Sequence, residues 1–169
     1  MLKLMGRADA TGLAGPAADD VWRVCLPEDA DNDLSGADEE APATSVACLL
    51  RDEQDAPPGY GLYLMAGHEA GMRPGMPGVA GSRGPGVSGM PGPVLRLGPE
   101  LAHLDAGDII HVSGDGRRVT VLWKNSARHN ALLLTEQCDN YCLMCSQPPK
   151  DRDDAWLFDR ARKVISLLP

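Results

Sequence analysis

The residues best suited to chemistry are three cysteines near the C-terminal end of the chain. Cys138, Cys142 and Cys145 follow one another in the spacing C-x3-C-x2-C, directly after the apolar run at 131–134. Thiolates are soft ligands that suit iron–sulfur clusters, zinc and copper(I). This spacing lets one loop turn its three sulfurs toward a single centre. The sequence therefore predicts a metal site at this loop.

Several ligand chemistries could use the triplet. Structural zinc has four ligands in a closed site, and the only nearby candidate for the fourth is His129. Disulfide bonds would leave one thiol over and would strain so short a loop. A ferredoxin-type cluster has a fourth cysteine, and the run C-x2-C-x2-C-x3-C-P is not matched. Three thiolates on a [4Fe–4S] cubane leave one iron open to an outside ligand, which is a catalytic arrangement. The sequence favours this open cluster over zinc.

At these residues the chain resembles the radical S-adenosylmethionine (radical SAM) superfamily, in which C-x3-C-x2-C lies on the loop after the first barrel strand. The stretch 133–150, which contains Cys-Leu-Met-Cys-Ser-Gln-Pro-Pro, and the stretch 153–156 after it are similar to one subgroup. That subgroup is the radical SAM maturase of the His-Xaa-Ser peptide system. The similarity covers 104–169.

The resemblance implies a cofactor, a substrate and a partner. Cys138, Cys142 and Cys145 would each bind one iron of a [4Fe–4S] cluster. The fourth iron would take the amino and carboxylate groups of S-adenosylmethionine, and one electron from the reduced cluster would cleave it to a 5′-deoxyadenosyl radical. The substrate would be a precursor peptide with His-Xaa-Ser repeats. A sister maturase or the remaining portion of the barrel is the implied partner, and no catalytic side chain is assigned.

Two features depart from the superfamily pattern. Many members carry an aromatic residue just before the third cysteine, beside the adenine, where this chain has Met144; Tyr141 lies on the other side of Cys142. A polarizable thioether can pack on a purine, so Tyr141 and Met144 are the predicted contacts for S-adenosylmethionine. The Gly-Gly-Glu segment that usually binds its amino group is not matched, because the chain contains no Gly-Gly pair.

Length sets the expected domain organisation. A full (β/α)8 barrel takes ~200–250 residues. This chain has 169 residues, so it has no room for both a full barrel and an N-terminal region. We expect a β-rich N-terminal domain at 1–125 and the start of a radical SAM barrel at 126–169, so that the chain is truncated, split or a fragment and is catalytically incomplete alone. The alternatives are a non-catalytic cluster-carrying or peptide-binding module of a split enzyme, and a zinc-stabilised interaction domain.

Net charge and hydropathy limit the classes of partner and the cellular compartments that the sequence predicts. The net charge of −8 and the pI near 4.9 argue against nucleic acid or an anionic membrane surface as the partner. No apolar run approaches the ~20 residues of a membrane helix, and the N-terminus lacks the pattern of a signal peptide. An odd number of cysteines, clustered rather than paired, fits the reducing cytoplasm.

The elements that must position the loop are mostly strands, so the fold class is α+β. Alternation predicts a small β-barrel or sandwich, in which a turn at 113–117 makes a hairpin. Cys25 and Cys48 are predicted core residues, and His103 and His111 are predicted structural histidines. A Gly- and Pro-rich flexible loop is predicted over 67–98, with order returning at 94–97. The predicted strands include 2–7, 21–26, 45–50, 60–65 and 119–123, with another ending at Val112.

The cysteine loop itself is expected between a strand and a helix. The strand, at 131–135, would be the first of the radical SAM barrel, since active sites of such barrels lie at the carboxyl ends of strands. Asp151, Asp153 and Asp154 suit the start of the following helix. That helix carries an apolar stripe that needs the rest of the barrel, the N-terminal domain or a partner chain to cover it. The stripe consists of Leu157, Ala161, Val164, Ile165 and Leu168.

Overall fold

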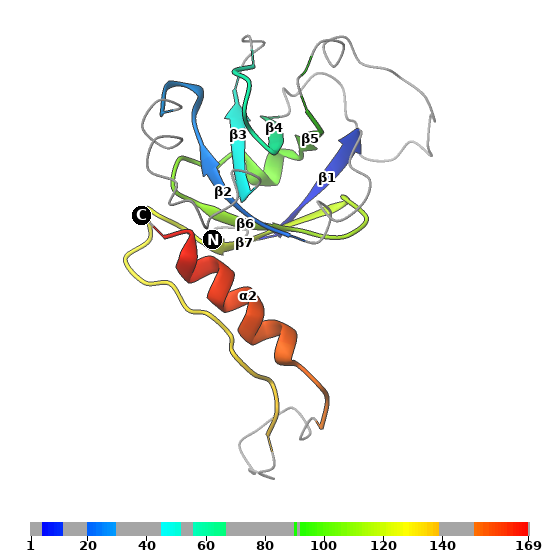
Figure 1. The fold of residues 1–169 in the computed structure, drawn as a ribbon, viewed down its shortest axis with the longest axis vertical. Coiled ribbons are helices and arrows are strands. Elements are labelled where there is room, and N and C mark those ends of the chain that lie inside the picture. Colours follow the sequence, from blue (N-terminus) through cyan, green and yellow to red (C-terminus); the bar gives the residue numbers. More distant parts are fainter. Residues whose placement is uncertain are drawn as a thin grey trace.

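A computed structural model describes residues 5–11, 20–29, 45–51, 56–66, 90, 92–138 and 151–168. These residues form a β-barrel with one α-helix beneath it (Figure 1). The strands are β1 (Met5–Thr11), β2 (Val21–Cys25), β3 (Val46–Leu50), β4 (Leu62–Ala66), β5 (Val94–Leu97), β6 (Ile109–Val112) and β7 (Arg118–Trp123). The helices are the 3-10 turns η1 (Pro27–Asp29) and η3 (Pro99–Leu101) and the α-helix α2 (Ala155–Ser166).

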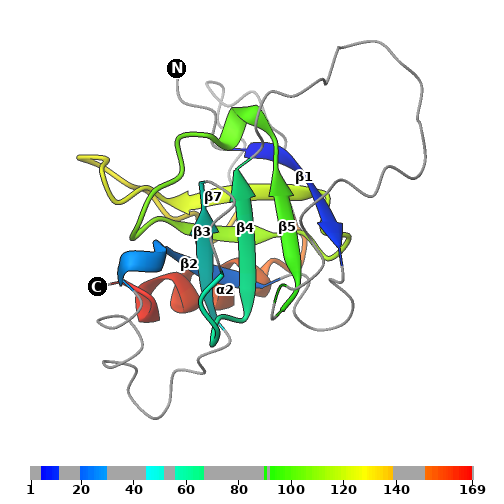
Figure 2. The same ribbon diagram turned by 90° about the horizontal axis from the view of Figure 1, so that it is seen from above.

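The strands close into a barrel in the order β1-β5-β4-β3-β2-β6-β7. Four neighbouring strands, β2 to β5, run parallel, and Figure 2 shows β3, β4 and β5 side by side. Closure depends on β1, which pairs antiparallel with both edges: Ala8 lies opposite Leu97 of β5, and Met5 lies opposite Thr120 of β7. The α+β class and the N-terminal barrel are therefore confirmed.

Two apolar clusters bury both faces of the parallel strands, as is typical of parallel sheets. The outer cluster contains Cys25, Cys48, Tyr60 and Tyr63. Cys25 and Cys48 are directly opposite each other on β2 and β3, and both are buried, which confirms their predicted core role. Burial, and secondarily the charge of Glu28, raises the pKa of the Cys48 thiol to about 11, so it stays protonated at neutral pH. The inner cluster comprises Trp22, Val24, Ala47, Leu49, Leu62, Leu64, Leu95, Leu97, Leu101, Leu104, Ile110, Val112, Val119 and Val121.

The predicted strands are largely confirmed. Strands β2, β3 and β7 lie within one residue of their predicted ranges, and β6 and β7 form the predicted hairpin. In its turn, Ser113 Oγ accepts the N–H of Arg118, and Gly116 has a φ of 65°, which suits glycine. Strand β1 is displaced from the predicted range and runs to Thr11. Most of the predicted flexible loop, 67–89 and residue 91, lies outside the described residues.

The predicted barrel strand at 131–135 is not a strand. Residues 126–138 contain no helix or strand, and after a turn that ends near Asn130 they form an extended segment that runs alongside α2 (Figure 1). Leu133 and Leu134 are half exposed, and no strand of the described residues pairs with them. A β-strand requires a hydrogen-bonded neighbour, so the described residues contain no βα unit. We call residues 126–138 together with α2 the arm.

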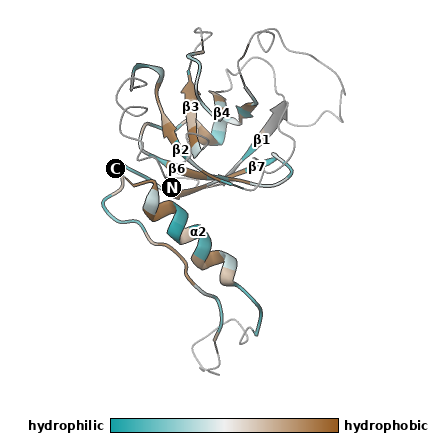
Figure 3. Cartoon of the chain, in the orientation of Figure 1, coloured by the Kyte–Doolittle hydropathy of each residue, from teal (hydrophilic) through white to brown (hydrophobic). Residues whose placement is uncertain are grey.

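The helix of the arm packs on the outside of the barrel. Leu157, Ala161 and Val164 are buried, and Val164 contacts Val21 of β2 and Ile109 of β6 in a third apolar cluster. The barrel thus covers the predicted stripe at Val164, and Leu168 packs against the same cluster, whereas Ile165 is 59% exposed. Figure 3 shows polar and apolar residues alternating along this helix, and the apolar Trp156 and Phe158 are about half exposed. No helix among the described residues is long and apolar enough to cross a membrane.

Candidate functional site

The first cysteine of the triplet lies at the tip of the extended segment. Cys138 is exposed and follows the exposed residues 133–137. Cys142, Cys145, Tyr141 and Met144 lie outside the described residues. Among the residues that the structure does describe, no group of three His, Cys, Asp or Glu side chains could hold a metal ion. The predicted cluster ligands are therefore represented only by Cys138, whose accessible thiol suits a soft metal.

Hydrogen bonds join the two ends of the cysteine loop. Asp154 Oδ2 accepts the Thr135 hydroxyl at 2.9 Å and the backbone N–H of Glu136 at 2.5 Å. Gln137 Nε2 donates to the backbone carbonyl of Arg152 at 2.7 Å. We call these five residues the loop neck. They tie the chain just before Cys138 to the chain just before α2.

The carboxylate of Asp154 is the central group of the loop neck. The N–H of Glu136, and to a lesser extent the hydroxyl of Thr135, lower the pKa of Asp154 because they stabilise its charged form. Asp154 occupies the N-cap position of α2, yet its side chain makes no bond to its own helix. The predicted capping role therefore falls to Asp153, whose Oδ1 accepts the N–H of Ala155. Sequence reasoning assigned Asp154 to the helix and missed its bond to the other end of the loop.

A buried ion pair lies at the root of the arm. Asp108, fully buried, accepts Lys124 Nζ at 2.6 Å and the backbone N–H groups of Asp105 and Asn125, each at 2.9 Å. Lys124 Nζ also donates to the carbonyl of His103 at 2.7 Å. Together these bonds hold the loop at 103–108 against the end of β7. The extended segment consequently begins from a rigid point.

Asn130 connects the start of the arm to Lys124. The Asn130 side chain accepts the backbone N–H of Lys124 at 2.9 Å and donates to its carbonyl at 3.1 Å. These two bonds fold 124–130 into a turn before the chain extends. His129, the candidate fourth zinc ligand, is exposed within this turn.

Polar contacts also hold α2 against the barrel, in addition to the apolar contacts of Val164. Arg160 Nη2 lies 2.9 Å from His111 Nε2, and because arginine only donates, the histidine nitrogen accepts. The same guanidinium stacks over Trp156 at 4.6 Å, and Lys163 pairs with Asp20 of the barrel. His111 is thus a structural histidine, as predicted. A cavity of about 380 Å³ remains among these side chains, at the junction of arm and barrel.

The spacing of Cys138, Cys142 and Cys145 in the sequence is what suggests that the thiols of this loop act together. No family model, no curated protein and no solved structure matches this chain. The chemistry of the loop therefore follows from its residues alone. Three thiolates fit a [4Fe–4S] cluster with one open iron, and the exposure of Cys138, just beyond the loop neck, is compatible with a role as the first ligand.

Proposed function

We propose that this chain is the N-terminal portion of a radical SAM enzyme that matures a peptide with His-Xaa-Ser repeats. In this proposal Cys138, Cys142 and Cys145 bind a [4Fe–4S] cluster, and S-adenosylmethionine binds its open iron. The observation that carries the proposal is the spacing C-x3-C-x2-C, which supplies three thiolates from one loop and leaves a fourth iron for an outside ligand.

The anchorage of the loop supports this proposal. The first thiol is exposed at the end of a segment whose root is fixed by Lys124, and the loop returns to a helix that is seated on the barrel. A loop that presents several ligands to one centre needs supporting contacts outside the ligand set. The loop neck, with Asp154 between Thr135 and Glu136, supplies such contacts.

Each part of the chain then has a role. When bound, the cluster supplies the electron that cleaves S-adenosylmethionine reductively. Tyr141 and Met144 are the proposed contacts for the adenine. The barrel and the arm position the loop, and the rest of the (β/α) barrel, or a sister maturase, completes the site around the precursor peptide. A reducing compartment, the cytoplasm, suits an oxygen-sensitive cluster of this kind.

Anaerobic reconstitution tests the proposal. We expect about four iron and four sulfide per chain and an EPR signal of the reduced cluster that changes when S-adenosylmethionine is added. Replacing Cys138, Cys142 or Cys145 with alanine should lower the iron content sharply. The matched control is Cys25→Ala with Cys48→Ala, which removes two thiols that are buried in the barrel wall.

Three results would contradict it. Stoichiometric zinc without sulfide would make the loop a structural zinc site. A cluster whose spectrum ignores S-adenosylmethionine would make the chain a cluster carrier rather than part of a radical SAM enzyme. Unchanged iron content in the three single variants would place the metal elsewhere.

A further inference from the structure

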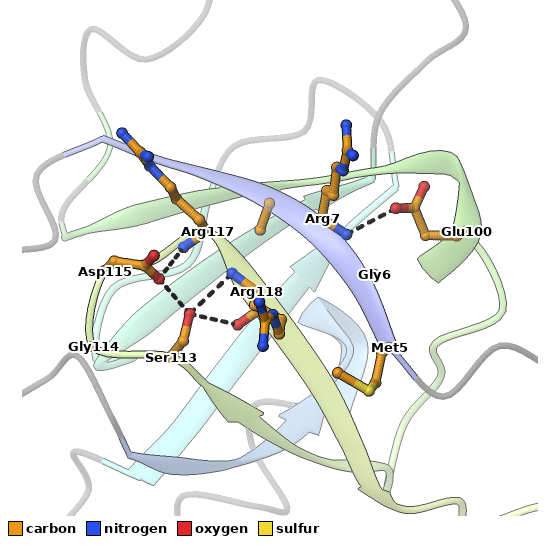
Figure 4. Close-up of a pocket in the computed structure, with 10 residues that line it drawn as sticks. Met5, Gly6, Arg7, Glu100, Ser113, Gly114, Asp115, Arg117 and Arg118 are labelled. Atoms are coloured by element: carbon orange, nitrogen blue, oxygen red, sulfur yellow. Dashed lines mark hydrogen bonds between the residues drawn. The ribbon is translucent and has the colours of Figure 1, made fainter.

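An open cavity of about 790 Å³ lies on the barrel wall where β1 crosses the turn of the β6–β7 hairpin. Three arginines line it: Arg7 from β1, and Arg117 and Arg118 from the hairpin. Figure 4 shows Arg118 close to the crossing of the two strands, with the side chains of Arg7 and Arg117 extending away from it. We call it the arginine cavity. Its positive lining is unexpected in a chain with a net charge of −8.

The strand register places two of these charges directly opposite each other. Arg7 pairs with Arg118 in the antiparallel β1–β7 ladder, so both side chains leave the same face of the sheet. Like charges in this arrangement destabilise a sheet. Among the described residues, no carboxylate lies within ion-pair distance of Arg7, Arg117 or Arg118. An anion between them would remove this repulsion.

Two acids also line the cavity, and both are engaged by the backbone. Asp115 Oδ1 accepts the hydroxyl of Ser113 at 2.6 Å and the N–H of Arg117 at 3.0 Å. Glu100 Oε1 accepts the N–H of Arg7 at 2.8 Å. Both carboxylates therefore fix the backbone that carries the arginines, and among the described residues no ion pair engages the guanidinium of Arg7 or Arg118.

Close packing beneath β1 fixes the arrangement further. A Cβ on Gly6 would lie 2.4 Å from Leu101 Cγ, so only glycine lets η3 approach β1 this closely. Arg7, the next residue, is thereby kept in register with Arg118. Met5, which is 52% exposed, adds an apolar wall to the same cavity.

We propose that the arginine cavity binds an acidic peptide segment, with aspartate or glutamate side chains on Arg7 and Arg118. A planar guanidinium matches a carboxylate with two parallel hydrogen bonds. The cavity volume lies within the ~300–1,000 Å³ range of ligand sites, larger than a single small anion needs, and Met5 offers contact to an aliphatic stem. The net charge of the chain disfavours a long polyanion such as nucleic acid. This proposal does not depend on the cysteine loop.

The test is fluorescence anisotropy with the full chain. The probe is a fluorescein-labelled peptide, Gly-Glu-Asp-Gly-Glu-Asp-Gly, and its counterpart carries Gln and Asn in place of the acids. We expect binding of the acidic probe only, weakening as salt is raised. The double variant Arg7→Gln, Arg118→Gln should weaken it about a hundredfold, since a charge-assisted bond contributes about tenfold or more. The control is Arg128→Gln with Arg162→Gln, two exposed arginines outside the cavity.

The outcomes separate this proposal from its competitors. The melting midpoint of the Arg7, Arg118 variant should equal or exceed that of the parent, because a like-charge pair is removed; lost binding then reflects the cavity and not unfolding. Equal losses in both double variants would overturn the proposal in favour of unspecific charge attraction. Inorganic phosphate that competes as strongly as the peptide would overturn it in favour of a small-anion site, and tighter binding of duplex DNA would overturn it in favour of nucleic acid.

Discussion

Two lysine–aspartate pairs show how differently the barrel and the arm are stabilised. In the barrel, Lys124 and Asp108 meet at 2.6 Å with side chains only 10% and 0% exposed. Between arm and barrel, Lys163 and Asp20 also meet, but their side chains are 58% and 25% exposed. Removing one partner of a buried pair leaves the other charge buried without compensation, whereas water can replace the missing partner of an exposed pair.

The same contrast holds for the apolar contacts. The barrel encloses one large cluster and a second on its outer face, whereas three buried residues, Val21, Ile109 and Val164, form the centre of the arm's seat. Regions with few buried apolar contacts open at lower free energy than the core. The arm should therefore detach from the barrel without unfolding it, and the cysteine loop would move with the arm.

The largest effect is expected at the buried pair. Lys124→Met leaves the carboxylate of Asp108 buried without its cation and should lower the free energy of unfolding by about 3–5 kcal/mol. Lys163→Met, the exposed counterpart, should change it by about 1 kcal/mol or less. Urea denaturation followed by tryptophan fluorescence measures both. Similar losses in the two variants would remove the distinction between the regions.

A smaller, local effect is expected at the seat of α2. Val164→Asp places a charge in the apolar contact with Val21, and hydrogen-exchange protection of α2 should fall about ten- to hundredfold, the equivalent of losing one buried valine. Barrel amides should keep their protection. Ile165→Asp, one residue further on and 59% exposed, serves as the control and should change little. Loss of protection in the barrel as well would show that arm and barrel unfold together.

The smallest effect is expected at the loop neck. The folded-state pKa of Asp154 is lowered, so its contribution is complete above the ordinary aspartate pKa and is lost as pH falls through the lowered value. The NMR signal of the Glu136 amide should therefore titrate below about pH 4. Asp154→Asn should abolish this titration, and Asp153→Asn should preserve it. Identical titration curves of the Glu136 amide in the parent chain and in the Asp154 variant would refute the contact.

Local patterns in the sequence predict most of the barrel strands. Alternation places β2, β3 and β7, and the turn chemistry before Arg118 predicts the hairpin. The parallel order of β2 to β5 is not predictable in this way, because it depends on pairing between distant segments and not on any one of them. The facing of Arg7 and Arg118 cannot be predicted for the same reason, since it depends on the register between β1 and β7.

The site is predictable only in part. Cysteine spacing predicts the loop, and the exposure of Cys138 is compatible with a ligand role, while all three ligand assignments remain predictions. The prediction of a strand at 131–135 is wrong, because a short apolar run such as 132–134 looks the same in the sequence whether it is buried or exposed. The bond between Thr135 and Asp154 could not be foreseen, since nothing in either segment marks the other as its partner.

The shared carboxylate at the loop neck has a thermodynamic consequence for ligand capture. Closing a chain segment into a ring costs conformational entropy, which normally opposes bringing scattered ligands around one ion. Here Asp154 and Gln137 already close the ring between Thr135 and Arg152 before any ion arrives. For the proposed cluster, part of the ordering penalty would thus be met during folding, and Asp154, which lies outside the proposed ligand set, would tune the affinity of the loop for the cluster.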